Sequence, residues 1–109
     1  MSDLLGTFEQ AVLLALVRLR SGAYGRAVLK EVQARLAREV AAGAVYATLD
    51  RLEGKGLISS RLAPGTAARG GRARRYYALE AAGERALNES KAAVEALWRG
   101  VAWPLGGEA

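Results

Sequence analysis

Five arginines stand close together in the segment RLAPGTAARGGRARRYYAL, residues 61–79, and no acidic residue accompanies them. They are Arg61, Arg69, Arg72, Arg74 and Arg75. The glycines and the proline between them are typical of a loop. Guanidinium groups suit the binding of anions such as phosphate. We therefore expect a cationic loop that meets a negatively charged partner.

The whole chain is basic, and its charge is unevenly distributed. It has 16 lysines and arginines against 11 aspartates and glutamates, a net charge of +5 and a pI near 10.1. Residues 51–75 hold seven basic residues against Glu53 alone, a net charge of +6, whereas residues 76–109 carry −2. Such a balance favours nucleic acid or an anionic membrane surface as the partner. One end of the molecule is expected to face a polyanion.

The residue types argue against an enzyme. The sequence has no cysteine and no histidine, which removes disulfides, thiolate nucleophiles, imidazole bases and nearly every zinc or haem site. Ser59 and Ser60 have no obvious base partner, and neither a P-loop nor a dinucleotide-binding glycine motif occurs. We therefore predict no catalytic activity, no cofactor and no metal site.

No segment suits a membrane span or a signal peptide. The longest apolar run, residues 11–17, is far shorter than the ~20 residues needed to cross a bilayer. It also lacks a basic flank before it. We expect a cytoplasmic protein that has no membrane contact.

Three helices are predicted in the first half of the chain. Thr7-Phe8-Glu9-Gln10 has the form of a capping box and begins a helix over 7–20, which is apolar nearly all round and is therefore expected in the core. Apolar residues at three- and four-residue spacing predict a second helix over 26–38 and a third over 44–55. Two short helices across a brief connection are typical of a helix-turn-helix.

The pattern then changes to period two, which predicts strands over 57–62 and 73–79 joined by a loop over 63–72. A final helix is expected from Glu80 or Ala81 to Val101, before Pro104 and a glycine-rich tail. The fold class is α+β and mainly α. We predict a winged helix-turn-helix DNA-binding domain over 1–79, a C-terminal dimerisation helix over 80–103 and a tail over 104–109.

The third helix is the expected recognition helix. Small residues near its N-terminus let a helix enter the major groove closely. Arg51 suits a guanine edge, and Thr48 suits a thymine methyl group or a phosphate. The residues that we expect at DNA are Tyr24, Ala44, Tyr46, Ala47, Thr48, Arg51, Lys55, Arg69, Arg72, Arg74 and Arg75.

Several of these residues have a structural alternative. A run of arginines can be a solvated face, although its place on a glycine-rich loop beside a helix-turn-helix favours DNA contact. For Tyr24, a phosphate hydrogen bond and simple packing fit the sequence equally well. At least one of Tyr76 and Tyr77 must face the core, because strand side chains alternate. A winged-helix module that binds protein or RNA is the alternative function.

The last helix favours a homodimer. It carries a short heptad-like seam, and the first helix is apolar on more than one side, so one chain alone leaves apolar area exposed. A two-fold dimer would place two recognition helices about one DNA turn, roughly 34 Å, apart, which suits a pseudo-palindromic operator. The expected interface residues are Phe8, Val12, Leu87, Val94, Leu97 and Val101.

The segments GAVYATLDRLEGKGLISS and GRARRYYALEAAGERAL resemble the PadR family of bacterial transcriptional regulators, and the resemblance covers roughly residues 4–99. The matching residues are Tyr24-Gly25, Tyr46, Leu49, Leu52, Gly56-Leu57-Ile58, Arg75-Tyr76-Tyr77, Leu79 and Gly83. The resemblance implies a homodimeric winged-helix DNA-binding protein, usually a repressor. The short segment after Leu79 is similar to the small members that have a single C-terminal helix.

The resemblance also implies a ligand. Some small members release DNA when an aromatic compound inserts between tryptophans of the last helix, and Trp98 is similar in position to that tryptophan. Trp98 could equally be a large core or interface side chain, and Trp103 lies nearby. The chain departs from the family at Ala44 and Glu80, where members often have a hydroxyl residue.

Overall fold

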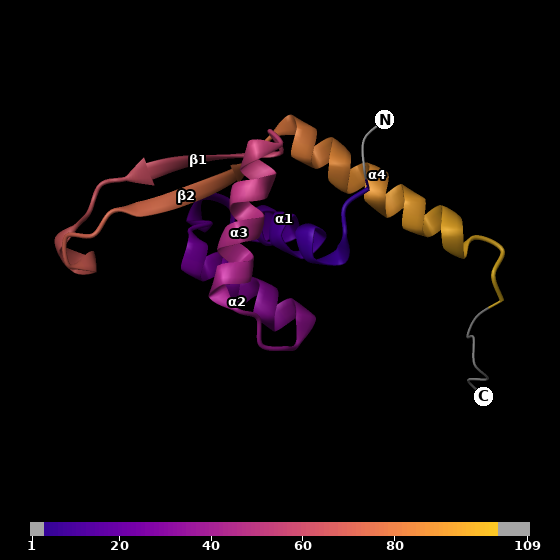
Figure 1. Ribbon diagram of the computed structural model, residues 1–109, viewed down its shortest axis with the longest axis horizontal. Coiled ribbons are helices and arrows are strands. Elements are labelled where there is room, and N and C mark those ends of the chain that lie inside the picture. Colours follow the sequence, from indigo (N-terminus) through magenta and orange to yellow (C-terminus); the bar gives the residue numbers. More distant parts are fainter. Residues whose placement is uncertain (1–3, 103–109) are drawn as a thin grey trace.

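The chain folds into three packed helices, an antiparallel hairpin and a long final helix. This computed structural model describes residues 4–102, and its helices are α1 (Thr7–Leu19), α2 (Gly25–Leu36), α3 (Ala42–Gly54) and α4 (Ala81–Trp98). The strands are β1 (Ile58–Ala63) and β2 (Arg74–Leu79), and short 3-10 turns lie at Arg20–Gly22 and Ala67–Arg69. This order confirms the predicted winged-helix fold, which is mainly α (Figure 1).

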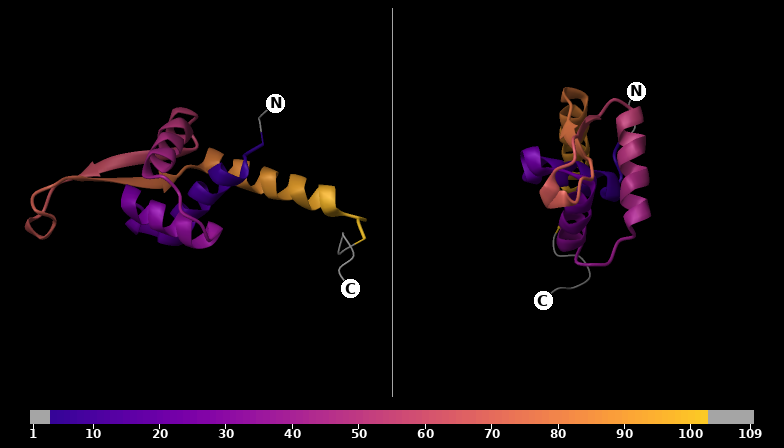
Figure 2. Two further views of the ribbon diagram at one scale, coloured as in Figure 1. Left: turned by 60° about the horizontal axis from the view of Figure 1, so that its bottom comes forward. Right: turned by 90° about the vertical axis from the view of Figure 1, so that its left-hand side faces the viewer.

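The hairpin and α4 extend in opposite directions from the helical body. α1, α2 and α3 lie together in the middle, with the hairpin at one end of the long axis and α4 at the other (Figures 1 and 2). The molecule measures 56 × 34 × 21 Å along its principal axes. The hairpin and α4 can therefore contact different partners.

One apolar core joins α1, α2 and α3. Val45, Leu49 and Leu52 of α3 are fully buried, as their spacing predicts. Val12 is fully buried as well, so its predicted place at a dimer interface is wrong. Because α1 is apolar on nearly every side, periodicity alone could not tell which of its residues cover the protomer's own helices.

The N-termini of α1 and α3 differ in detail from the sequence pattern. The helix α1 begins at Thr7 as predicted, but its N-cap is Gly6, whose N–H donates to Glu9 Oε1 at 3.1 Å. Because glycine has no side chain to accept a hydrogen bond in return, the full capping box predicted from Thr7 does not form. The helix α3 begins at Ala42 and not at Ala44, because Ala41 is the extended residue that precedes its first turn. Helix ends are the least certain part of a periodicity argument.

The hairpin is held against the helices at its base. Its register pairs Ile58 with Leu79 at one end and Ala63 with Arg74 at the other. Tyr77 is the strand tyrosine that faces the core, and its N–H donates to the Ala23 carbonyl oxygen at 2.8 Å. The far end projects into solvent and carries the 3-10 turn and the loop glycines (Figure 2). This hairpin is hereafter called the wing.

The helix α4 is buried only along its first half. Gly83 and Ser90 are buried, whereas Val94, Leu97 and Trp98 are exposed by 45%, 77% and 49%. The helix ends at Trp98, so Val101, predicted at the end of the helical seam, lies beyond it. Trp103, Pro104 and the tail lie outside the described residues.

Gly83→Ala is expected to destabilise the fold by about 1–3 kcal/mol, because overpacking at a rigid contact costs this much. A Cβ atom at Gly83 would lie 2.3 Å from the Leu57 carbonyl oxygen, which is backbone and cannot move away cheaply. Urea unfolding followed by circular dichroism measures the change. Gly43→Ala on the exposed face of α3 is the control, since nothing lies within 4 Å of its Cβ position. Equal stability of the two variants would contradict the prediction.

Candidate nucleic-acid interface

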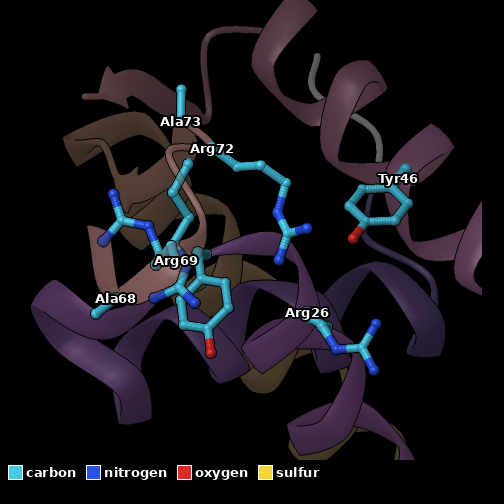
Figure 3. A pocket seen from close by; sticks show the side chains of 8 residues that line it. Arg26, Tyr46, Ala68, Arg69, Arg72 and Ala73 are labelled. Atoms are coloured by element: carbon cyan, nitrogen blue, oxygen red, sulfur yellow. The ribbon is translucent and has the colours of Figure 1, made fainter. Parts of the chain in front are cut away.

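A cationic cleft lies between the wing and the N-terminal halves of α2 and α3. Its volume is about 800 Å³. Figure 3 shows side chains from α2, α3 and the wing loop around it. The residues that line it are Tyr24, Arg26, Tyr46, Ala68, Arg69, Arg72, Ala73 and Arg74. Four of these are arginines and none is acidic, so the cleft suits an extended anion.

Two tyrosines, each with an arginine over its ring, pack together where the wing meets α2. The Arg74 guanidinium carbon is 3.7 Å from the centre of the Tyr24 ring. The Tyr24 ring meets Tyr76 edge to face at 5.7 Å, and Arg61 lies 4.9 Å from the centre of the Tyr76 ring. Such cation–π contacts fix the orientation of a guanidinium group. The structure thus provides the packing role that the sequence left open for Tyr24.

A hydrogen bond strengthens the contact between the strand residues of this stack. Arg74 Nη1 donates to the Tyr76 hydroxyl at 3.5 Å. This hydrogen bond, together with the nearby positive charges, lowers the pKa of Tyr76 below its usual value.

The arginines of the cleft differ in how firmly they are held. Arg69 donates to the Pro64 carbonyl oxygen and so closes the wing loop. Arg72 and Arg26 are exposed, on the loop and on the first turn of α2. Sequence analysis missed Arg26, because charge clustering pointed to the wing and nothing in the pattern showed that the start of α2 faces it.

The helix α3 presents small residues and one tyrosine to the solvent. Ala44 and Ala47 are exposed, and Tyr46 is 42% exposed beside the cleft. The Tyr46 ring packs on α2 where only glycine fits, since a Cβ at Gly25 would lie 2.3 Å from Tyr46 Cε1. A helix face of this kind can approach another surface closely.

Thr48 does not belong to that exposed face. Its side chain is only 3% exposed, and its Oγ1 atom accepts a hydrogen bond from Arg51 Nη2 at 3.3 Å. The predicted contact between Thr48 and a thymine methyl group or a phosphate is therefore wrong. Thr48 lies at the edge of the buried stripe of α3, where the spacing of residues along the helix does not show whether a side chain is buried or exposed.

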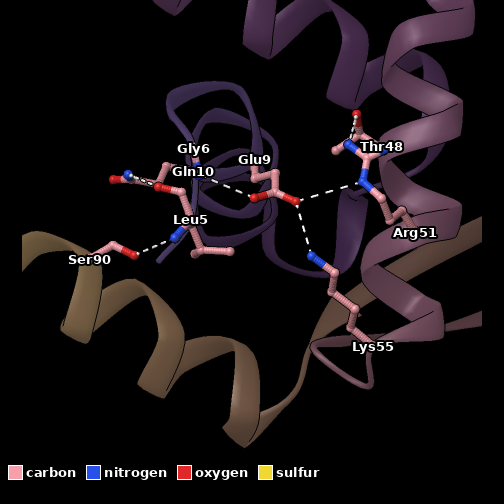
Figure 4. Close-up of polar contacts among 8 residues, drawn as sticks. All are labelled: Leu5, Gly6, Glu9, Gln10, Thr48, Arg51, Lys55 and Ser90. Atoms are coloured by element: carbon pink, nitrogen blue, oxygen red, sulfur yellow. Dashed lines mark hydrogen bonds and ion pairs between the residues drawn. The ribbon is translucent and has the colours of Figure 1, made fainter. Parts of the chain in front are cut away.

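Three other basic residues expected at DNA do not line the cleft. Arg51 and Lys55 lie on the far flank of α3 and form ion pairs with Glu9 of α1, at 3.7 and 3.4 Å (Figure 4). Arg75 lies on the wing face opposite Arg74, and its Nη1 atom donates to Ser60 Oγ at 3.0 Å. Of the predicted set, the cleft therefore gathers Tyr24, Tyr46, Arg69, Arg72 and Arg74.

A second surface, apolar and unpartnered, lies between α1 and α4. It is a groove of about 570 Å³ to which Leu14, Val17, Leu87 and Val94 contribute. Of the expected dimer residues, Leu87 and Val94 line this groove and Leu97 is exposed on α4. Phe8 is partly buried against the protomer core, and Trp98 does not line the groove.

The described residues offer neither a membrane span nor a metal site. No helix within residues 4–102 is both long enough and apolar enough to cross a bilayer. The same residues contain no group of three or more metal-binding side chains. Glu31, for example, pairs with Arg18 and Arg35.

Solved structures similar to this chain are transcriptional regulators. A PadR family regulator from Eggerthella lenta is 36% identical, with a TM-score of 0.65 over 83% of this chain and 76% of that one. A PadR-like factor from Bacteroides fragilis is 28% identical, with a TM-score of 0.69 over 84% of each chain. A PadR family regulator from Clostridium difficile is 26% identical, with a TM-score of 0.63 over 85% and 95%.

The sequence itself matches a family model. No curated protein is significantly similar. The model of the PadR-like family of transcriptional regulators matches residues 13–89, which include the helix-turn-helix, the wing and the first half of α4. Members of this family are DNA-binding regulators and not enzymes. The winged fold and the cationic cleft agree with this match, and the chain belongs to the PadR-like family of transcriptional regulators.

Proposed function

We propose that this protein is a homodimeric repressor that binds a pseudo-palindromic operator. The observation that carries the proposal is the cleft, in which arginines of the wing and of α2 lie beside the exposed face of α3. In this arrangement α3 enters the major groove with its exposed face, where Ala44 and Ala47 permit a close approach and Tyr46 reaches base edges. Arg26 and Arg72 bind phosphates on either side and fix the register of the helix on the duplex.

The apolar groove supports the dimer. Exposed apolar side chains on α1 and α4 form one continuous surface that a second copy of α4 would bury. Burial of apolar area contributes about 25 cal/mol per Å². Two-fold symmetry then presents two copies of α3 to successive turns of the same face of DNA.

A mobility-shift experiment tests the proposal. The full chain is titrated against DNA from upstream of its own gene and against a random duplex, at about 50 and 200 mM salt, the range over which phosphate contacts lose much of their strength. Tight binding to the upstream DNA that survives the higher salt is expected of an operator-specific repressor. Equal, salt-sensitive binding to both duplexes would contradict it. Competition with RNA and DNA duplexes at fixed salt separates this function from RNA binding.

A planar aromatic effector is a further part of the proposal, and Trp98 is its expected contact. Trp98 is half-exposed at the end of α4, next to the surface assigned to the dimer. Planar aromatic compounds are expected to quench tryptophan fluorescence and to release DNA, and Trp98→Ala is expected to abolish both effects. Quenching that persists in this variant would assign the signal to Trp103 or to nonspecific association.

A further inference from the structure

The carboxylate of Glu9 lies beside two basic side chains of the recognition helix. Its Oε2 atom is 3.7 Å from Arg51 Nε and 3.4 Å from Lys55 Nζ. Arg51 lies on α3 and Lys55 is the C-cap residue four positions later, so a single acid from α1 reaches both (Figure 4). We propose that Glu9 limits DNA affinity by holding these two cations, which otherwise bind backbone phosphates. The inference rests on the proposed DNA binding.

The burial of the three side chains differs in a way that permits competition. The Glu9 side chain is 17% exposed, whereas those of Arg51 and Lys55 are 52% and 48% exposed. The acid therefore lies behind the cations, and a phosphate can approach them from the solvent. Ion pairs between exposed side chains are weak, because water and salt screen them. A phosphate of the DNA backbone is thus able to replace the carboxylate as the partner of each cation.

The position of Glu9 is fixed by the polypeptide around it. Its Oε1 atom accepts the Gly6 N–H at 3.1 Å, at the N-terminus of α1, where the helix dipole favours a negative charge. The preceding Leu5 N–H donates to the buried Ser90 Oγ of α4 at 3.0 Å. Glu9 is therefore a built-in counterion whose place does not depend on the flexible side chains that it pairs with.

Glu9 is ionised at neutral pH. Partial burial raises the pKa of its carboxyl, but the hydrogen bond from Gly6 and the charges of Lys55 and Arg51 together outweigh burial, and the pKa lies below its usual value. The cluster of Glu9, Arg51 and Lys55 consequently carries a net charge of +1. Neutralising Glu9 raises this charge to +2 and frees up to two cations for phosphate.

Glu9→Gln tests the inference, because glutamine keeps an oxygen for the Gly6 N–H and loses only the charge. The variant is expected to bind random duplex DNA more tightly than the natural protein. The plot of log affinity against log salt is expected to steepen by up to about 1.8, since each new phosphate contact adds about 0.9 to the slope. Elution from a heparin column at higher salt provides a readout that is independent of DNA recognition.

Glu31→Gln is the matched control. Glu31 likewise pairs with two basic residues, Arg18 at 3.8 Å and Arg35 at 2.9 Å, but these lie away from α3. The replacement changes the net charge by the same amount as Glu9→Gln. Its salt slope is expected to equal that of the natural protein. If Glu9→Gln and Glu31→Gln have the same slope and elute together from heparin, the inference is wrong. Failure of the natural protein to bind any duplex would overturn the proposed function instead, and heparin elution would still decide the role of Glu9.

Two additional variants test whether the effect comes from the charge of Glu9 and acts through the two cations. Glu9→Ala removes the charge and the hydrogen bond from Gly6 together, and it is expected to give the same increase in slope as Glu9→Gln. Adding Arg51→Gln and Lys55→Gln to Glu9→Gln is expected to abolish that increase. An increase that survives the loss of both cations would show that Glu9 acts elsewhere, and the inference would be rejected.

Discussion

Replacing Arg26 and Arg72 together by alanine is expected to weaken binding to every DNA duplex, whatever its sequence. Both side chains are exposed and line the cleft from opposite sides. Each lost phosphate contact is expected to reduce the slope of log affinity against log salt by about 0.9, so the pair reduces it by about 1.8. Fluorescence anisotropy of a labelled duplex, measured at four or five salt concentrations, gives the slope directly.

Arg38→Ala with Arg85→Ala is the control for this experiment. These two exposed arginines do not line the cleft, and replacing them removes the same net charge as replacing Arg26 and Arg72. The slope of log affinity against log salt for this double variant is expected to equal that of the natural protein. Arg75→Ala adds a finer comparison, because Arg75 is on the wing but its side chain bonds Ser60 on the opposite face. Equal reductions in all of these variants would show that overall charge, and not the cleft, determines binding.

Placing glutamate at both Val94 and Leu97 is expected to convert the dimer into a monomer. Val94 lines the apolar groove and Leu97 is 77% exposed, so the charges cost the protomer little but would be buried in a dimer. A monomer binds one half-site, and loss of the linked second site is expected to lower operator affinity by about 10²–10⁴-fold. Sedimentation velocity measures the mass, and anisotropy measures the affinity.

Leu62→Glu provides the same chemical change at a distant site. Leu62 is 61% exposed on β1 of the wing, far from α4 in Figure 1. This variant is expected to remain a dimer. If the Val94 and Leu97 variant also keeps the mass of a dimer, the groove between α1 and α4 is not the interface, and the homodimer part of the proposed function needs another surface.

The periodicity of apolar residues was sufficient for the fold, although Gly25 and Gly43, which precede the helices predicted over 26–38 and 44–55, lie inside α2 and α3. Val45, Leu49 and Leu52 are buried as their spacing predicts, and the change to period two marks the wing. The errors at Thr7 and Ala44 concern single turns, where capping residues compete. Gly6 is the N-cap of α1 because the Glu9 side chain reaches its N–H, and a threonine one residue later offered a similar pattern.

The candidate site was predictable only in part, because it depends on which helix flank faces which neighbour. The arginine cluster identified the wing, and the structure brings Arg69, Arg72 and Arg74 into the cleft. Arg51 was expected beside them, but Glu9 lies 42 residues away in the chain and no local pattern links the two. Contacts of this kind follow from the packing of α1 against α3, which spacing along one helix does not encode.

The two-stranded sheet of the wing has a consequence for solubility. Within residues 4–102 no third strand covers it, and only the base of β2 pairs further, with residues 23–24. The edge of β1 and the outer part of β2 therefore present backbone groups that could pair with the edge of another molecule. Arg61, Arg74 and Arg75 lie on these strands, and their like charges repel an approaching copy. The charge that suits the wing to a polyanion therefore also protects free molecules from edge-to-edge aggregation. Variants that neutralise the wing strands are consequently expected to lose colloidal stability along with affinity.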